Sequence, residues 1–587
     1  MKKKTLRRKP THDTAEILEA RIAPATFTVI NLSDSGVGSL RQAVLDSEAN
    51  TTADTIVFAK NLTGNIVLTT GQLVVTQPLK VNGPGAGKIL IDGNANSRIF
   101  NVDDSNIAKD SPFSISGLSL YNGDARVNNG SDKGGTIYST ESLTMKGCVV
   151  SGSTATCGGG VYVKNDTAIK VLVSDSTISG NSATQGYGGG LYLVAGGGVS
   201  VLNSTVSGNT ATQSGGGAYL RIRGNPSIPN QKITVTGSVF SQNSSDTYGG
   251  GLGIVSDFLK VSITNTEISG NTANRNGGGL YLGRAFPTLT GCTIAGNSTT
   301  GAGGNGGGVF LKASSATFKD SHILGNSAFE DGGGIAYDGD RYPLHILTVN
   351  GGNIAGNNAA RDGGGIFGTN DGKVVSNSVN FQGNSANRFG GGISTAGIGG
   401  ASIKLEISGG IFRGNSAFSG GAVDTSGDGT VAIKNAKFNS NKTTFGDGGA
   451  LYLRTKTTAT IMNSLFKGNS AYDNCGAIAL GGGGTFTVSG ISVLNNSSAK
   501  SGAGLGVFNC PHVNISKSLF KGNFTPINGG GIGVFSSTMS IQTSIITGNV
   551  ANGTGGGIYR NAIAALTLAT TVKLFGNTAP TNPDKNF

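Results

Sequence analysis

The chain of 587 residues contains no Trp, only 4 His and 13 Pro, and 13% charged residues. Without Trp it lacks the largest aromatic side chain that can pack against flat ligands. The charged fraction is about half of that in ordinary domains. The histidines are too far apart in the sequence to suggest a metal-binding pattern, and they are His12, His322, His345 and His512.

Three further absences narrow the class of protein. The five cysteines are widely spaced and contain no CxxC pair, so the sequence predicts neither a zinc site nor a disulfide framework. No run of 18 apolar residues occurs, so we expect no transmembrane helix. The net charge is +12, but basic and aromatic residues gather in no single stretch, which argues against a nucleic-acid partner.

Residues 1–25 differ from the rest of the chain. They begin with MKKKTLRRKP and carry seven basic residues against three acidic ones. They lack the apolar stretch of roughly 7–15 residues that a secretory signal needs. We therefore predict that 1–25 is a basic segment that is disordered or serves in targeting.

Glycine is the abundant residue, with 100 copies. It follows no three-residue period, which excludes collagen, and proline is too scarce for a low-complexity linker protein. This composition favours a repetitive β architecture with many tight bends.

A repeat of about 28 residues runs through the chain, marked by an Asn in motifs such as SGNTA. Fifteen such Asn occur between Asn181 and Asn577, at intervals of 26 to 34 residues. A period in this range is typical of a solenoid. The residue three positions before each Asn, and before Ser153 one period earlier, is apolar in every unit, and the residue five positions before is usually small.

These positions predict the structure of one repeat. Positions −5 and −3 lie on the same face of a strand, which must point into the core. A Gly cluster follows each Asn and leads into an apolar-aromatic pair, such as Leu280-Tyr281. Because the Gly cluster recurs and precedes a strand rather than a helix, it is not a nucleotide-binding loop. Each unit is thus predicted to be three short strands, forming one of about 16 coils of a parallel β-helix.

The repeated Asn has a structural interpretation. Its amide both donates and accepts, so stacked copies about 4.8 Å apart can bond to one another in a ladder. For a single copy, a simple role as a turn former is an equal alternative. We expect a ladder that includes Asn181, Asn209, Asn271, Asn297, Asn326, Asn384, Asn415, Asn469, Asn523 and Asn549.

The segments outside the repeats complete the domain prediction. Residues 26–140 are expected to form the N-terminal cap and the first coils. Within them, 34–50 places Leu40, Val44 and Leu45 at helical spacing, which indicates a short capping helix. Residues 141–580 are expected to form the β-helix repeats, and 581–587 a disordered tail.

Several motifs resemble bacterial surface proteins. The segment 32–59, with GSLRQAV and DTIVF, is similar to the GSLRxAI…DTIxF motif that precedes a right-handed parallel β-helix. GGAL at 448–451 and FxxN motifs such as FKGN at 466–469 resemble the repeats of polymorphic outer-membrane proteins. ILEARIAPA at 17–25 is similar to the LEPR-type motif of planctomycete surface proteins. The resemblance implies an all-β, single-stranded right-handed parallel β-helix of the pectate-lyase type. It also implies a bacterial extracellular or cell-surface location.

Two functions fit this prediction. We favour a non-enzymatic adhesin, structural rod or glycan-binding surface, with extracellular glycans or surface proteins as partners and no cofactor or metal. The alternative is a secreted polysaccharide lyase or glycoside hydrolase, whose site would stack acidic residues from adjacent coils for Ca²⁺ binding or acid–base work. The candidates for it are Asp338 and Asp340 in one coil and Asp371 in the next, and these residues are equally typical of turns.

Overall fold

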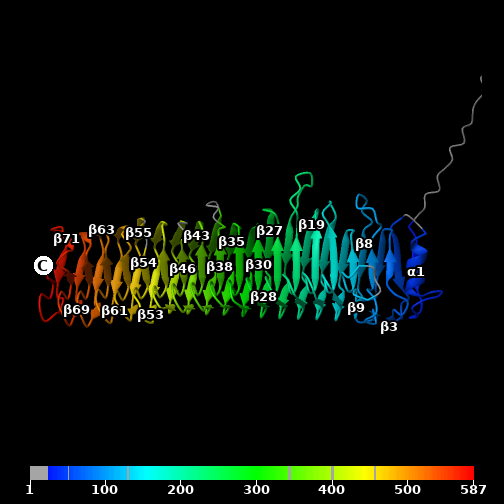
Figure 1. Cartoon of the computed structure of the whole chain (residues 1–587), viewed down its shortest axis with the longest axis horizontal. Coiled ribbons are helices and arrows are strands. Elements are labelled where there is room, and N and C mark those ends of the chain that lie inside the picture. Colours follow the sequence, from blue (N-terminus) through cyan, green and yellow to red (C-terminus); the bar gives the residue numbers. More distant parts are fainter. Residues whose placement is uncertain are drawn as a thin grey trace, which may run out of the picture.

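The computed structural model describes residues 24–49, 52–127, 131–340, 345–397, 402–454, 456 and 458–586. Most of the predicted N-terminal segment, residues 1–23, lies outside the described residues. In these ranges the chain winds into a long parallel β-solenoid with a single helix, α1, at one end (Figure 1). No helix in the described part is long and apolar enough to cross a membrane.

One coil contains four strands, illustrated by β14 (Val161–Asn165), β15 (Lys170–Ser174), β16 (Thr177–Ser179) and β17 (Ser182–Ala183). Each strand pairs in parallel with its equivalent in the next coil, so that β14 pairs with β18 (Leu191–Ala195). The resulting ladders are sheet C (with β14), sheet A (with β15), sheet B (with β16) and sheet D (with β17), of 19, 20, 19 and 15 strands.

The prediction of three strands per coil was wrong, because a coil has four. The fourth is the two-residue strand that follows the repeated Asn, such as β17. Its half-buried Ser and its single buried Ala give no hydrophobic alternation long enough to indicate a strand. The 19 strands of sheet B also exceed the 16 units visible in the sequence, because 26–140 adds β3 (Gly64–Val67), β6 (Ile89–Asp92) and β9 (Ser119–Tyr121).

The core is a continuous stack of apolar side chains inside the solenoid. Position −3 lies there as predicted, and in the C-terminal half it forms a column of Phe381, Phe412, Phe438 and Phe466. Their ring centroids are 4.5, 4.8 and 4.8 Å apart and all four rings are fully buried. Each buried Phe contributes about 2–3 kcal/mol through the hydrophobic effect.

The asparagine ladder predicted from the repeat runs beside this core. In each step the backbone N–H and the side-chain amide of one Asn donate to the Oδ1 of the next. For Asn271 and Asn297 both distances are 2.9 Å. The same amide also donates to a carbonyl of the preceding coil, as Asn297 Nδ2 does to Ile268 O at 2.8 Å. These asparagines are at most 1% exposed except the last, Asn577, so the ladder satisfies polar groups that would otherwise be buried without partners.

Helix α1 (Leu40–Ser47) lies across the first coil, where a capping helix was expected (Figure 1). Ser39 caps its N-terminus by accepting from Gln42 N. Leu40 and Val44 are buried, whereas Leu45 is 58% exposed and does not belong to the packed face. Leu45 lies five positions after Leu40, a separation that leaves the face defined by positions i, i+3 and i+4.

At the other end, β73 (Lys585–Asn586) pairs with β70 (Ile558–Arg560). This pairing lies within 581–587, where the sequence predicts a disordered tail. The chain is therefore still hydrogen-bonded to the solenoid at Lys585. A strand was not evident there because the terminal sequence is polar and lacks the apolar alternation of the repeats.

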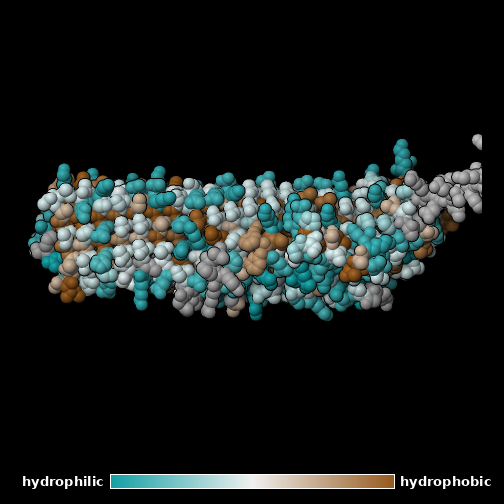
Figure 2. Space-filling view, turned by 90° about the horizontal axis from the view of Figure 1, so that it is seen from above, coloured by the Kyte–Doolittle hydropathy of each residue, from teal (hydrophilic) through white to brown (hydrophobic). Residues whose placement is uncertain are grey.

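Because the coils are in register, residues at the same outward position of successive coils form a row along the axis. Seen from above, narrow hydrophobic and neutral rows run lengthwise over the C-terminal half of the rod (Figure 2). A substitution in one coil therefore changes one place in a row whose other members keep their spacing.

We expect Asn297→Ala to destabilise the middle of the solenoid. The change removes the acceptor of the Asn271 N–H, removes one of the two bonds of the Asn271 amide, which keeps its bond to Phe240 O, and takes a donor from the Ile268 carbonyl, all in a buried site. Unsatisfied buried groups cost about 1–3 kcal/mol each, so we expect a local loss of about 3 kcal/mol. Because long repeat arrays do not unfold in two states, the measurement is amide hydrogen exchange of the coils around 268–326.

The matched control is Asn274→Ala, which removes an exposed Asn three residues after the ladder. Its exchange rates should stay close to those of the wild type. Equal protection in the Asn297→Ala and wild-type proteins would show that the ladder does not stabilise the coils.

We also expect a pH dependence at the cap. Asp34 accepts hydrogen bonds from Arg41 and from the backbone and hydroxyl groups of Thr69 and Thr70. Burial alone would raise the pKa of Asp34, but these bonds outweigh it and lower the pKa from 3.8 to about 2. The stabilisation is thus present above pH 3.8 and is lost as the pH falls toward 2.

Asp34→Asn should remove this dependence. After a discount for solvent screening, the wild-type cap should lose about 1 kcal/mol over that pH range, and the variant clearly less. Hydrogen exchange of α1 at several pH values measures it, with the exposed Asp46→Asn on the same helix as the control. An equal acid sensitivity of all three proteins would contradict the assignment.

Candidate ligand-binding slot on sheet C

The outer face of sheet C carries a row of aromatic rings. In β14, Val161 and Val163 belong to the core and Tyr162 lies between them on the opposite face. Tyr162 stacks on Tyr192 of the next coil with ring centroids 4.6 Å apart and planes within 5°. The row continues from Tyr192 to Tyr219 at 5.5 Å and, further along, from Tyr281 to Phe310 at 5.9 Å. Burial raises the pKa of Tyr281 to about 12, so this phenol is uncharged at neutral pH.

Two coils interrupt this part of the row with small residues. In β26 (Leu252–Val255), Gly253 lies between Tyr219 and Tyr281. Tyr248, from the preceding turn, stacks on Tyr281 at 5.1 Å, and both rings line one end of the cavity described next. In β38 (Ile335–Asp338), Ala336 lies between Phe310 and Phe367. This second gap is a cavity.

The cavity at Ala336 has a volume of about 400 Å³ and is lined by residues of successive coils. Phe310 of β34 (Val309–Lys312) and Phe367 of β42 (Ile366–Thr369) flank Ala336 along the axis. Two coil spacings separate these two strands, about 9.6 Å, which leaves room for one flat ring in the position of the missing one. We call this cavity the slot.

Polar side chains line the rest of the slot. Lys312 and Asp338 come from the next outward row of sheet C, and Asn305, Asp331 and Arg361 come from the turns between sheets D and C. Lys312 Nζ lies 2.7 Å from Asp338 Oδ2, and Arg361 Nε donates to Asp331 Oδ1 at 2.8 Å. The slot therefore offers apolar ring faces together with hydrogen-bond donors and acceptors.

Hydrogen bonding and burial set the charges of this lining. Burial opposes the charged form of Asp338, but hydrogen bonds from Lys312 and Asn370 lower its pKa below the usual value. Burial likewise opposes the charge of Lys312, whose bonds to Asp338 and Asp340 raise its pKa. Burial raises the pKa of Asp331, although the guanidinium of Arg361 opposes this shift.

The three candidate acids do not form one group. Asp338 lines the slot, and Asp340 forms an ion pair with Lys312 at 3.0 Å. Asp371 instead accepts from the backbone N–H of Ser402. Counting equal offsets from the strands places Asp340 beside Asp371, yet Gly339 packs there: a Cβ on Gly339 would lie 1.8 Å from the Asp371 carbonyl oxygen.

The backbone explains this shift. Asn370 and Asp371 both have left-handed φ, 59° and 50°, whereas in the equivalent pair Gly339-Asp340 only Asp340 does, at 54°, so the two turns differ. Equal offsets therefore stop predicting contacts once the chain leaves the strand.

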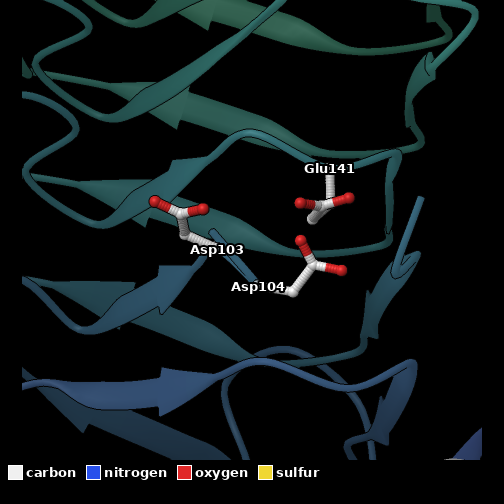
Figure 3. Close-up of side chains that lie close together, drawn as sticks. All are labelled: Asp103, Asp104 and Glu141. Atoms are coloured by element: carbon white, nitrogen blue, oxygen red, sulfur yellow. The ribbon is translucent and has the colours of Figure 1, made fainter. Parts of the chain in front are cut away.

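A different acidic group was not predicted from the sequence. Asp103, Asp104 and Glu141 offer carboxylate oxygens within 4.8 Å of one another, and within the described ranges they are the one such group (Figure 3). Carboxylates are ligands that Ca²⁺ prefers. Each of the three, however, already accepts from the protein: Asp103 from Thr140, Asp104 from Ser111 Oγ, and Glu141 from Ser111 N.

The surroundings shift the pKa values of Glu141 and Asp104 in opposite directions. Burial raises the pKa of Glu141, and the nearby Asp104 contributes to the rise. Burial would raise the pKa of Asp104 too, but bonds from Ser111 and Asn106 and the cation of Lys109 lower it. The sequence signal was present: Asp104 and Glu141 follow the paired residues Val102 and Ser139 at the same offset.

Comparisons with known proteins agree with this architecture. A family model described as a right handed beta helix region matches residues 87–285. With the parallel ladders of the structure, it shows that the fold is a right-handed parallel β-helix, as predicted. No curated protein sequence matches the chain. Among solved structures, that of the PL6 family alginate lyase AlyGC is similar at 10% identity and a TM-score of 0.25, with 94% of this chain and 100% of that chain covered.

Proposed function

We propose that the protein is a non-enzymatic β-helix rod of the bacterial cell surface or exterior that binds a glycan in the slot at Ala336. The observation that carries this proposal is the missing ring between Phe310 and Phe367, flanked by polar side chains. The location outside the cell follows from the resemblance of the sequence to bacterial surface proteins.

A sugar ring fits the chemistry of the slot. A pyranose has a flat face of C–H groups that packs against aromatic rings, and hydroxyl groups at its edge that donate and accept. Phe310 and Phe367 supply the apolar faces, while Lys312, Asp338 and Arg361 supply hydrogen-bonding groups. The volume of about 400 Å³ lies within the range of small-ligand sites.

The arrangement of the acids supports binding without catalysis. A glycan-cleaving site needs carboxyl groups placed on both sides of the scissile bond, one of them with a raised pKa. The slot holds two carboxyl groups, Asp331 and Asp338, and each is bonded to a cation: Arg361 holds Asp331, whose pKa burial raises, and Lys312 holds Asp338, whose pKa is lowered. Asp340 also pairs with Lys312 but does not line the slot. Asp371 is bonded elsewhere, to Ser402.

The shape of the molecule supports a role in display or adhesion. Nineteen coils at about 4.8 Å each make a rod of roughly 90 Å. A ligand bound near its middle lies far from both ends, so that the rod separates the binding site from any attachment at its ends.

We expect Ala336→Phe to abolish glycan binding. The added ring completes the aromatic row between Phe310 and Phe367 and occupies the slot, so affinity should fall at least about tenfold, which corresponds to 1.4 kcal/mol. Thermal stability should be unchanged or higher, because the new ring fills a cavity. Oligosaccharide arrays identify the ligand, and titration calorimetry measures its affinity for each protein.

The matched control is Ala432→Phe, which adds the same ring to an exposed outward position on sheet A. Phe310→Ala, which removes one wall of the slot, should also weaken binding. Unchanged affinity in Ala336→Phe would exclude the slot as the binding site. Cleavage of an acidic polysaccharide that disappears in Asp340→Ala and Asp371→Ala would exclude the non-enzymatic function.

A further inference from the structure

A second surface, on sheet B, carries positive charge without neighbouring negative charge. We define the basic face by Arg413 of β48 (Ile411–Arg413), Lys437 of β52 (Lys437–Asn439), Lys467 of β56 (Leu465–Lys467) and Lys521 of β64 (Leu519–Lys521). All four side chains are on the outer side and exposed. Among the described residues, none of them forms an ion pair with an acid.

The acids of this half of the chain lie on other faces. Glu406 on sheet A pairs with Lys373, and Asp424 on sheet C pairs with Arg454. The outward positions of sheet B from β48 to β64 contain no Asp or Glu. Other exposed cations of this half, among them Lys404 and Lys434 on sheet A, also form no ion pair among the described residues, so the regular spacing of its cations is what distinguishes this face.

The cations follow a regular spacing. Strand pairing aligns Arg413 with Asn439, Lys467, Leu494 and Lys521 in successive coils. The basic residues of this row thus recur at every second coil, about 9.6 Å apart. Lys437 stands in the adjacent outward row, one coil from both Arg413 and Lys467.

The surface around these cations is hollowed. A shallow cavity of about 830 Å³ is lined by Arg413, Lys437 and Lys467. The same cavity is lined by amide side chains, including Asn380 and Gln382, and by the aliphatic side chains of Ile411 and Leu465. It therefore combines cationic donors, amides that can bond hydroxyl groups and apolar patches between the charges.

We infer that the basic face binds an acidic polysaccharide that carries one negative charge per disaccharide. The repeat of an extended disaccharide is close to the two-coil spacing of the cations, so successive charges of the polymer can meet Arg413, Lys467 and Lys521 in turn. The aliphatic side chains between them receive the sugar rings. This inference does not depend on the function proposed for the slot.

Single-stranded nucleic acid fits this face less well. Proteins bind it with exposed aromatic rings that stack on the bases, together with a positively charged groove. The outward positions of sheet B from β48 to β64 contain no aromatic residue. An alternating uronate polymer requires no such rings.

The test titrates the full chain with hyaluronan oligosaccharides, in which each uronate alternates with an uncharged sugar. We expect binding that weakens between about 50 and 200 mM NaCl, because counterions compete for the cations. The double variant Arg413→Glu/Lys467→Glu should bind at least roughly tenfold more weakly. The conservative double variant Arg413→Lys/Lys467→Arg should keep most of the affinity.

Two controls separate this site from folding and from the slot. Lys260→Glu reverses an exposed charge on β27 (Lys260–Thr264) of sheet A and should leave hyaluronan binding unchanged. The double reversal should leave the slot ligand bound, and Ala336→Phe should leave hyaluronan bound. These controls distinguish a loss of binding at one site from a loss of binding at the other and from misfolding.

Three results would overturn the inference. They are the absence of hyaluronan binding to the wild type, equal binding to the double reversal, and tighter binding of single-stranded DNA or of phosphatidylglycerol vesicles than of hyaluronan. The last two probes compare the polysaccharide directly with the other polyanionic partners available to a basic surface.

Discussion

The register between coils is the constraint on which the structure depends, and buried asparagine amides hold it. Each amide joins two coils by bonds to the next asparagine and to a carbonyl of the previous coil, as Asn297 does with Asn326 and Ile268. A coil that slipped by one residue would lose these bonds and turn its core residues outward. The ladder thus specifies the fold as well as stabilising it.

Because the register is fixed, residues at one position of successive coils form rows, and the two proposed binding sites are departures from those rows. The slot exists because Ala336 replaces an aromatic residue where Phe310 and Phe367 maintain the row on either side. The basic face exists because cations recur in one row of sheet B while the acids lie on other sheets. Neither feature requires a change in the backbone of the coils.

The features that recur in every coil, or that follow local rules of the chain, are the ones that the sequence could predict. The core position, the asparagine ladder and the capping helix repeat or follow local rules, so their places are evident from spacing alone. The slot was not predicted, because an interruption of the row becomes a cavity only if no other side chain fills it. Gly253 interrupts the same row, and there Tyr248 from a turn stacks on Tyr281. Whether a side chain from a turn fills such a gap depends on the conformation of that turn, and the repeat pattern does not predict this conformation.

The positions of the acidic residues could likewise be predicted next to paired strands but not within the turns. Offsets correctly align Asp104 with Glu141, which directly follow paired strands. They misplace Asp340 relative to Asp371, because the two turns differ in backbone conformation: Asn370 is left-handed and the equivalent Gly339 is not. Spacing is therefore reliable within the ladders and fails within a few residues of leaving them.

The direction of the hydrogen bonds has a mechanical consequence. All the bonds between coils lie along the axis of the rod, and the five cysteines form no disulfide that could join distant coils. A pulling force on the ends would load these bonds one coil after another, as in opening a zipper, and not all at once in shear. The rod would then lengthen by the release of single coils and absorb work at each step.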